Sequence, residues 1–266
     1  MTPPVALTIA GSDSGGGAGI QADLKTFAAN GVFGTSVVTA VTAQNTVGVD
    51  AVHVVPAAIV EAQLTAVLAD LPVAAVKTGM LATAEMVALV AGRAASGELP
   101  DLVVDPVLVS ATGHQLLEDD AVEVYRRELF PHARIITPNL REAGVLLGRE
   151  LTTLDEAREG ARELAGLGPD IVVVKGGHGE GPQAIDVIVT ADGEHELSAG
   201  RIDTGNDHGT GCTFAAATAA GLASGRAPIE ALTAAKDYVT RCIGGSATWT
   251  LGRGHGPLDH LGFEDS

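Results

Sequence analysis

His208-Gly-Thr-Gly-Cys-Thr-Phe-Ala-Ala-Ala-Thr-Ala-Ala-Gly221 begins as a glycine-rich turn and runs directly into a helix made almost wholly of small residues. The first backbone N–H groups of such a helix have no partner inside it and lie at the positive end of its dipole. The sequence therefore predicts an anion site there, where Gly209 and Gly211 allow close approach to the backbone. A tight turn before a buried helix, with Cys212 as a small core residue, is the alternative.

Cys212 stands at this helix start, where a thiol loses its proton most easily. The second cysteine, Cys242, lies in a predicted helix and is interpreted as a buried residue. Two cysteines form neither a metal-ligand spacing nor a disulfide framework. We therefore expect a reducing compartment and treat Cys212 as the chemically interesting thiol.

The composition of the 266-residue chain restricts both its core and its partners. Hydrophobic residues make up 46% of the chain but aromatic residues only 3%, so Val, Leu, Ile and Ala must form the core. Such a core suits parallel strands covered by helices. The net charge of −17 argues against nucleic acid or an anionic membrane as the partner. Because neither a signal peptide nor an apolar run of membrane-spanning length is recognisable, we expect a cytoplasmic protein.

Short apolar runs alternate with helical segments along the chain. The expected strands are residues 5–10, 35–43, 73–78, 101–107, 134–137 and 170–175, followed by a hairpin of residues 184–189 and 194–198. Residues 48–55 suggest a short β excursion or flap. No linker or internal repeat interrupts this order. We therefore predict one α/β domain over residues 1–266, a three-layer α/β/α sandwich with a mostly parallel central sheet and a small β flap.

Three polar residues follow predicted strands, at the sheet edge where ligands collect in folds of this class. Gln44 carries both a donor and an acceptor and can read the edge of a heterocycle. Asp105 is an acid at the same edge. Lys175 precedes two glycines and is placed either for a phosphate or for a structural ion pair.

Asn139 and Glu142 lie three residues apart and share a predicted helix face. They form either a helix cap or a pair that manages metal and phosphate. The glycine-rich residues 11–19 lack the ending of a P-loop, so they serve either as backbone against a small ligand or as a flexible turn. Asp23, one turn into the next helix, is expected to face the same cleft. Together these features suit phosphoryl transfer from a magnesium nucleotide to a small alcohol.

Seven stretches also carry a family resemblance. They are Leu7-Thr-Ile-Ala-Gly-Ser-Asp-Ser-Gly-Gly-Gly-Ala-Gly-Ile-Gln-Ala-Asp-Leu-Lys-Thr26, Val41-Thr-Ala-Gln-Asn-Thr46, Lys77-Thr-Gly-Met80, Val104-Asp-Pro-Val107, Thr137-Pro-Asn-Leu-Arg-Glu-Ala143, Lys175-Gly-Gly-His178 and His208-Gly-Thr-Gly-Cys-Thr213. In this order they cover nearly the whole chain. The sequence resembles the hydroxymethylpyrimidine/phosphomethylpyrimidine kinases of thiamine biosynthesis, within the ribokinase-like superfamily.

The resemblance implies a two-step kinase that phosphorylates hydroxymethylpyrimidine on its alcohol and then phosphorylates the monophosphate to the diphosphate. It implies that Gln44 binds the aminopyrimidine edge. The other implied substrate-binding residues are Gly11, Ala18, Asp23, Thr42 through its backbone, Met80 and Val107. A homodimer is expected, with pairing of the flap between subunits.

The same resemblance implies ATP and Mg²⁺ and leaves a monovalent cation open. Asn139 and Lys175 would bind the nucleotide, and Asp105 and Glu142 would lie at the metal. The turn of Gly209, Thr210, Gly211 and Cys212 would form the anion hole, with the two glycines also contacting nucleotide phosphate. Cys212 occupies the position where many superfamily members carry an aspartate base, so we assign it the role of proton acceptor as a hypothesis.

Two departures from the family pattern stand out. Relatives often carry a lysine after Asp-Pro-Val, whereas residues 109–113 read Val-Ser-Ala-Thr-Gly, so a charge contact from this loop is not expected. Asn206-Asp207 replaces the common Asn-Thr, and we expect Asp207 to point to solvent. The alternatives are a pyridoxine or pyridoxal kinase of vitamin B6 salvage (or dual activity), a hydrolase using Cys212 and His208, and a non-catalytic ligand sensor.

Overall fold

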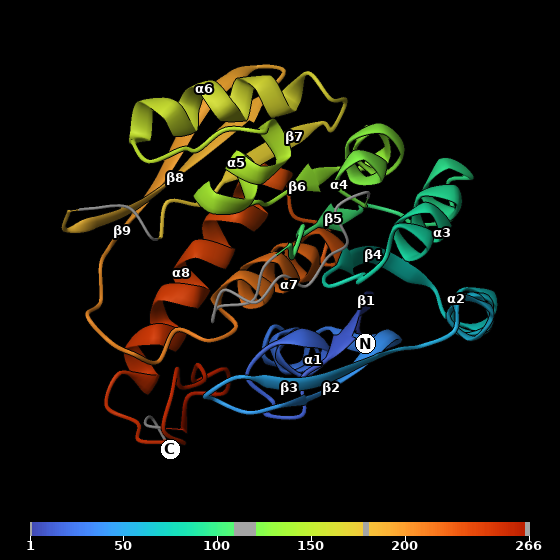
Figure 1. Ribbon diagram of the computed structural model, residues 1–266, viewed down its shortest axis with the longest axis horizontal. Helices are drawn as coiled ribbons and strands as arrows, with labels where there is room; N and C mark the ends of the chain where they lie inside the picture. Colours follow the sequence, from blue (N-terminus) through green and yellow to red (C-terminus); the bar gives the residue numbers. More distant parts are fainter. Residues whose placement is uncertain (1, 109–120, 178–180, 264–266) are drawn as a thin grey trace.

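The computed structural model describes residues 2–108, 121–177 and 181–263. In these residues nine strands form one sheet in the order β3-β2-β1-β4-β5-β6-β7-β8-β9 (Figure 1). The strands are β1 (Val5–Ser12), β2 (Phe33–Gln44), β3 (Val49–Val54), β4 (Val73–Thr78), β5 (Val103–Val104), β6 (Ile135–Ile136), β7 (Ile171–Val174), β8 (Gln183–Thr190) and β9 (Gly193–Gly200). Strands β2, β1, β4, β5, β6 and β7 are parallel to one another, and antiparallel pairing is confined to β3 at one side and to β8 and β9 at the other.

Helices cover both faces of the sheet and complete the predicted three layers (Figure 1). They are α1 (Gly19–Ala29), α2 (Ala57–Asp70), α3 (Ala84–Ala95), α4 (Ala121–Val124), α5 (Leu140–Leu147), α6 (Leu154–Ala165), α7 (Thr210–Ala223) and α8 (Pro228–Ser246). Alternate strand residues face opposite layers. Val104 and Ile136 pack in one cluster with α2 to α6, whereas Val103 and Ile135 pack in a second cluster with α1, α7 and α8. The predicted sandwich is therefore confirmed.

Three predicted elements differ in detail from the structure. The strands expected at residues 101–107 and 134–137 shrink to the two-residue strands β5 and β6. Pro106 has no N–H to donate to a ladder, and Pro138 limits β6 in the same way. The expected flap is β3, which pairs with the second half of β2 and therefore extends the edge of the main sheet.

The helix expected at residues 119–130 also has a different form in its described part. After α4 the chain winds through a π-helical turn at Tyr125–Leu129 and a 3₁₀ turn at Phe130–His132. Pro131 lies inside this second turn and prevents the chain from continuing as an α-helix. Among the described residues, no helix combines the length and the apolar character needed to cross a membrane.

A buried ion pair ties α1 to the centre of the sheet. Lys77 Nζ on β4 donates to both carboxylate oxygens of Asp23 at 3.0 and 2.9 Å, and Thr8 Oγ1 on β1 donates to the same carboxylate at 2.6 Å. Neither charged side chain is exposed to solvent. Because two charges removed from water must compensate each other, neither residue is expected to tolerate loss of the other.

We predict that Lys77→Met lowers the free energy of unfolding by about 3–5 kcal/mol, because it leaves the Asp23 carboxylate buried without a counter-charge. Urea unfolding followed by circular dichroism measures this loss. The matched control is the double variant Asp23→Asn with Lys77→Met, which removes both charges and should lose less stability. An equal loss in the single and double variants would show that packing volume, and not the unpaired charge, is responsible.

Candidate functional site

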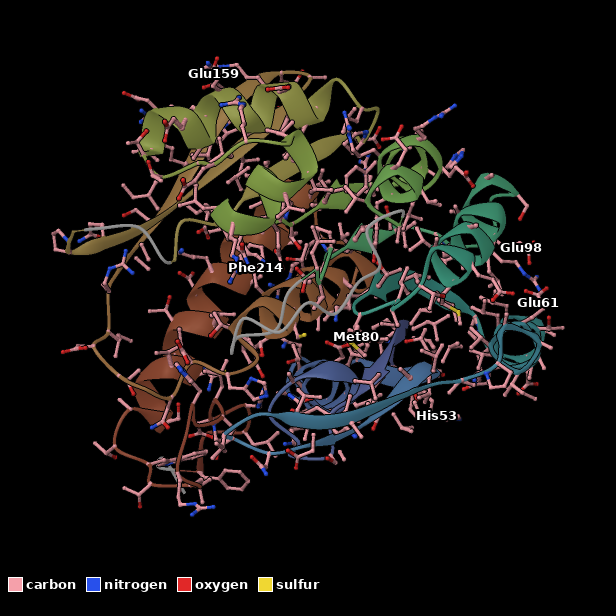
Figure 2. All side chains as sticks on the ribbon, viewed as in Figure 1. His53, Glu61, Met80, Glu98, Glu159 and Phe214 are labelled. Carbon is pink, nitrogen blue, oxygen red and sulfur yellow. The ribbon has the colours of Figure 1, made fainter. Side chains whose placement is uncertain are left out.

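One large cavity of about 1870 Å³ opens where the central parallel strands end. Met80, from the loop after β4, and Phe214, from the first turns of α7, both line it (Figure 2). The sequence-predicted site residues that line this cavity are Gly11, Ala18, Thr42, Gln44, Met80, Asp105, Val107, Asn139, Glu142, Lys175, Gly209, Thr210, Gly211 and Cys212. The structure therefore brings together residues that lie up to 201 positions apart, from Gly11 to Cys212.

Asp23 is the predicted site residue that the structure places elsewhere. Its side chain is fully buried in the ion pair with Lys77 and does not line the cavity. The expectation that it faces the cleft is wrong, because the buried face of α1 also carries Phe27, four residues further on. Asp23 therefore lies behind the cavity wall, where its charge helps to raise the pKa of Cys212.

The anion turn and the amino-terminal loop cross in direct contact. Gly209 has a φ of +91°, and a Cβ atom there would overlap the carbonyl oxygen of Gly17. Conversely, a Cβ at Gly17 would overlap the ring of His208. Gly209 is the N-cap of α7 and offers no side chain to its first N–H groups, so the helix start suits an external anion.

The helix that follows this turn is also core. Residues Thr213 to Ala223 of α7 are buried, and its small side chains let it pack against α1, α8 and β4. Both sequence interpretations of the segment are therefore correct for different parts of it. The turn lines the cavity, and the rest of the helix fixes the turn in place.

A charged cluster lies beside the start of α7. Lys175 Nζ is 2.8 Å from Asp105 Oδ1, and Thr137 Oγ1 donates to the same oxygen at 3.2 Å. A Cβ atom on Gly211 would lie 3.1 Å from Lys175 Nζ, so the ammonium group approaches the helix start. Burial opposes the charged form, but Asp105 and Glu142 raise the pKa of Lys175 above its usual value. Lys175 thus forms the structural ion pair and also borders the anion turn.

Asn139 and Glu142 form the predicted capping box at the start of α5. Asn139 Oδ1 accepts from the Glu142 N–H at 2.9 Å, and Glu142 Oε2 accepts from the Asn139 N–H at 2.8 Å. Burial, assisted by the charge of Asp105 and opposed by that of Lys175, raises the pKa of Glu142 to about 7. The capping role is confirmed, and Glu142 also borders the cavity.

Asp105 and Glu142 are the two carboxylates predicted to lie at a metal, and both line the cavity. Among the described residues, no group of three or more His, Cys, Asp or Glu side chains could hold a metal ion. Two carboxylates still fit Mg²⁺, which keeps most of its waters and takes further oxygens from substrate phosphates. They do not fit a metal that requires a complete protein cage.

Cys212 is partly exposed at the start of α7, whereas Cys242 is buried as expected. Burial raises the pKa of the Cys212 thiol to about 11, although the charge of Lys77 acts in the opposite direction. The expectation that the helix start makes this thiol easy to ionise is therefore wrong for this structure. Desolvation outweighs the helix dipole here.

Gln44, at the end of β2, occupies another part of the cavity wall. Its backbone N–H donates to Ser14 Oγ at 2.8 Å, and the Ser14 hydroxyl donates to the Gln44 carbonyl at 2.7 Å. Its side chain lies between Thr42 Oγ1, 3.1 Å from its oxygen, and His208 Nε2, 3.4 Å from its nitrogen. His208 Nε2 in turn lies 2.9 Å from Asp13 Oδ2.

Sequence reasoning missed three residues of the cavity wall, namely Asp13 and the ion pair of Lys236 with Asp186. It assigned His208 a role only in the alternative hydrolase. All four side chains line the cavity, and Lys236 Nζ lies 2.8 Å from Asp186 Oδ2. Asp186 also accepts from the Gly176 N–H at 3.0 Å, directly after Lys175. An aspartate before consecutive glycines was the available signal for Asp13, since its carboxylate accepts from the N–H groups of that loop.

Two expectations concern neighbouring loops. Asp207 has a side chain that is 44% exposed and that pairs with His255 at 2.8 Å, but both residues line the cavity, so Asp207 does not simply point away from the site as expected. The residues 109–113 lie outside the described residues.

Comparison with known proteins identifies relatives over the whole length of the chain. The family model described as phosphomethylpyrimidine kinase matches residues 13–259. A hydroxymethylpyrimidine/phosphomethylpyrimidine kinase from Rhizobium meliloti (strain 1021) is 52% identical over 267 residues, which cover 97% of each chain. A kinase of the same name from Streptomyces coelicolor is 48% identical and covers 98% of this chain and 95% of its own.

Solved structures give the same fold. The ADP complex of a pyridoxal kinase from Bacillus subtilis has a TM-score of 0.91 at 38% identity and covers 99% of both chains. A phosphomethylpyrimidine kinase from Clostridium difficile 630 has a TM-score of 0.79 at 41% identity and covers 90% of this chain and 99% of its own. The chain therefore belongs to the phosphomethylpyrimidine kinase family and has the ribokinase-like α/β/α fold.

Proposed function

We propose that this protein is an ATP-dependent kinase that phosphorylates 4-amino-5-hydroxymethyl-2-methylpyrimidine on its alcohol and then converts the monophosphate to the diphosphate. The observation that carries the proposal is the cavity, which joins Gln44 to the anion turn and to the Lys175–Asp105 pair. The first feature recognises a neutral heterocycle and the others neutralise phosphate charge. The names of the relatives in Rhizobium and Streptomyces support the same reaction.

The pyrimidine ring would lie at the Gln44 end of the cavity. Gln44 offers a donor and an acceptor to the aminopyrimidine edge, with help from the backbone of Thr42. Apolar side chains of Ala18, Met80 and Val107 line the same cavity and would pack against the ring, and Gly11 lets its backbone approach the ligand. In this structure a side chain at position 11 would collide with Met80.

The nucleotide phosphates would lie between α5 and the start of α7. Lys175 and Asn139 would bind them, together with the N–H groups of the turn from Gly209 to Cys212. Asp105 and Glu142 would hold Mg²⁺ with the phosphates. The metal would neutralise charge on the phosphate oxygens.

Cys212 is proposed as the group that accepts the proton of the substrate alcohol. It lies at the anion turn, close enough to Lys77 for that charge to favour a thiolate. Because burial raises the pKa of this thiol, the proposal requires its ionisation to be coupled to substrate binding or to higher pH. His208 pairs with Asp13 and contacts Gln44, an arrangement that does not support a Cys–His hydrolase.

A pyridoxal kinase remains the second candidate, favoured by the structural similarity to the Bacillus subtilis pyridoxal kinase at a TM-score of 0.91. Pyridine and pyrimidine alcohols are similar in shape. The two functions differ in one measurable respect, since a vitamin B6 kinase has no second phosphorylation to perform.

The central prediction is that the purified protein, with ATP and Mg²⁺, forms both the monophosphate and the diphosphate of hydroxymethylpyrimidine. Turnover should disappear when Mg²⁺ is chelated. Two protein carboxylates are too few ligands to retain the ion against a chelator, and the remaining ligands would come from the nucleotide phosphates and water. Product formation is followed by chromatography, with pyridoxine as a parallel substrate. Turnover of pyridoxine without turnover of the pyrimidine monophosphate would contradict the proposal and favour the second candidate.

A second prediction concerns Cys212. If its thiolate accepts the alcohol proton, kcat/KM should rise with pH from 7 to 9, because the thiol pKa of about 11 lies above this range and the base form increases with pH. Cys212→Ala should lower kcat by about 10²- to 10⁴-fold and remove the pH dependence, with pyrimidine binding retained. Cys242→Ala is the matched control, since that thiol is buried in α8. Near-normal turnover by Cys212→Ala would remove this thiol from the mechanism.

A third prediction concerns the proposed homodimer. β3 is the edge strand at one end of the sheet, and such a strand can pair with another chain. Val52 on β3 and Val41 on the adjacent strand β2 are 42% and 45% exposed. Light scattering should give about twice the chain mass of 26.8 kDa. Val52→Asp should shift the protein toward the monomer. A monomeric wild-type protein at micromolar concentration would contradict the dimer.

A further inference from the structure

A hydrogen-bonded network joins three distant parts of the chain around the Gln44 side chain. Asp13 belongs to the loop after β1, Gln44 ends β2, and His208 precedes the anion turn. His208 Nε2 lies 2.9 Å from Asp13 Oδ2 and 3.4 Å from the side-chain nitrogen of Gln44. Each contact involves the same ring nitrogen, so the position of one proton decides what Gln44 can do.

The carboxylate of Asp13 determines where that proton lies. Its oxygens accept from the N–H groups of Gly15 at 2.7 Å, Gly17 at 3.1 Å and Ala18 at 2.8 Å, and the side chain is 3% exposed. Burial alone would raise the pKa of Asp13, but these bonds and the one with His208 lower it below its usual value. An ionised carboxylate can only accept, so His208 Nε2 must carry a hydrogen and donate it to Asp13.

Thr42, the neighbour on the other side of the Gln44 side chain, also restricts the orientation of the Gln44 amide. Thr42 Oγ1 lies 3.0 Å from the Ser12 carbonyl oxygen, which is an acceptor only. Thr42 has one hydroxyl proton for these two contacts, and we assign it to the Ser12 carbonyl, which is the nearer and cannot reverse its role. The oxygen of Thr42 is then an acceptor toward Gln44, at 3.1 Å from the amide. A protonated Nε2 has no lone pair to accept from the Gln44 nitrogen. The amide therefore fits both neighbours better when it is turned by 180°, with its oxygen sharing the Nε2 hydrogen with Asp13 and its nitrogen donating to Thr42.

We infer that Asp13 and His208 are specificity-determining positioning residues that fix the Gln44 amide in this turned orientation. The cavity then presents an acceptor on the His208 side and an N–H donor on the Thr42 side. That order complements a ring edge in which an amino group stands beside an unprotonated ring nitrogen. A glutamine free to rotate would accept that edge and its inverse equally. The inference rests on the proposed function, because it deepens the recognition of an aminopyrimidine at the same site.

The test compares two pyrimidine alcohols that differ only at this edge. The first carries the 4-amino group. The second is its 4-oxo analogue, in which a carbonyl oxygen replaces the amino group and the adjacent ring nitrogen carries hydrogen, so that donor and acceptor are exchanged. The wild-type protein should prefer the amino compound in kcat/KM by about tenfold or more, since a mispaired buried hydrogen bond is costly.

Asp13→Asn and His208→Gln should each reduce this preference to about threefold or less, because they release the proton that fixes the amide. If the two residues had a merely structural role, each variant would lower kcat/KM for the amino and the oxo compound by the same factor. The preference would then be unchanged, and this result would overturn the inference. Where a variant turns over neither compound, calorimetric binding of the two compounds gives the same ratio. His195→Gln is the control, since this histidine is exposed on β9 and does not line the cavity, so the variant should retain the wild-type preference.

A second measurement separates this inference from the proposed reaction. Nitrogen-15 NMR of the His208 ring, assigned with the His208→Gln variant, should show a hydrogen on Nε2 in the wild-type protein without any ligand. An unprotonated Nε2 would overturn the inference whatever the substrate is. A protonated Nε2 in a protein that phosphorylates neither pyrimidine would overturn the proposed function and leave the fixed amide standing.

Discussion

The contact between Gly17 and Gly209 is the constraint on which the site depends. A Cβ atom at either position would overlap the opposite loop, so two glycines are required for the loops to cross. Because they cross, Asp13 reaches His208, and the anion turn lies in the same cavity as the end of β2. The glycine at position 209 also starts α7, whose buried small residues hold the turn against the sheet.

An acidic chain with a net charge of −17 needs local positive charge to receive phosphate, and the cavity is lined by Lys175, Lys236, Arg141, Arg149 and Arg201. The chain has four lysines, and three of them each pair with one carboxylate, as Lys77 with Asp23, Lys175 with Asp105 and Lys236 with Asp186. Each ammonium group is therefore fixed in direction before any ligand arrives. Preorganised charge of this kind stabilises a transferring group without the cost of reorientation.

The sequence predicted the parts that depend on local pattern. The strand Val73–Thr78 has its predicted bounds, and the capping box of Asn139 and Glu142 was readable from a three-residue spacing. Long-range pairing was not readable in this way. Asp23 was taken for a cleft residue because its partner Lys77 lies 54 positions further along the chain, and the easy ionisation of Cys212 was expected because a helix start gives no sign of the desolvation around it. Shared placement of Asp23 and Phe27 on one face of α1 was the missed signal.

The crossing of the two glycine loops also has a consequence for how the protein matures during synthesis. In the strand order β1 is third of nine, and from β4 onward each new strand adds beside the previous one. His208 is made 195 residues after Asp13, which at roughly 5–20 residues per second corresponds to about 10–40 s of translation. Through that interval the side chains of Asp13 and Gln44 lack their contact with His208. The contact that joins the two loops can therefore form only while the last quarter of the chain is being made.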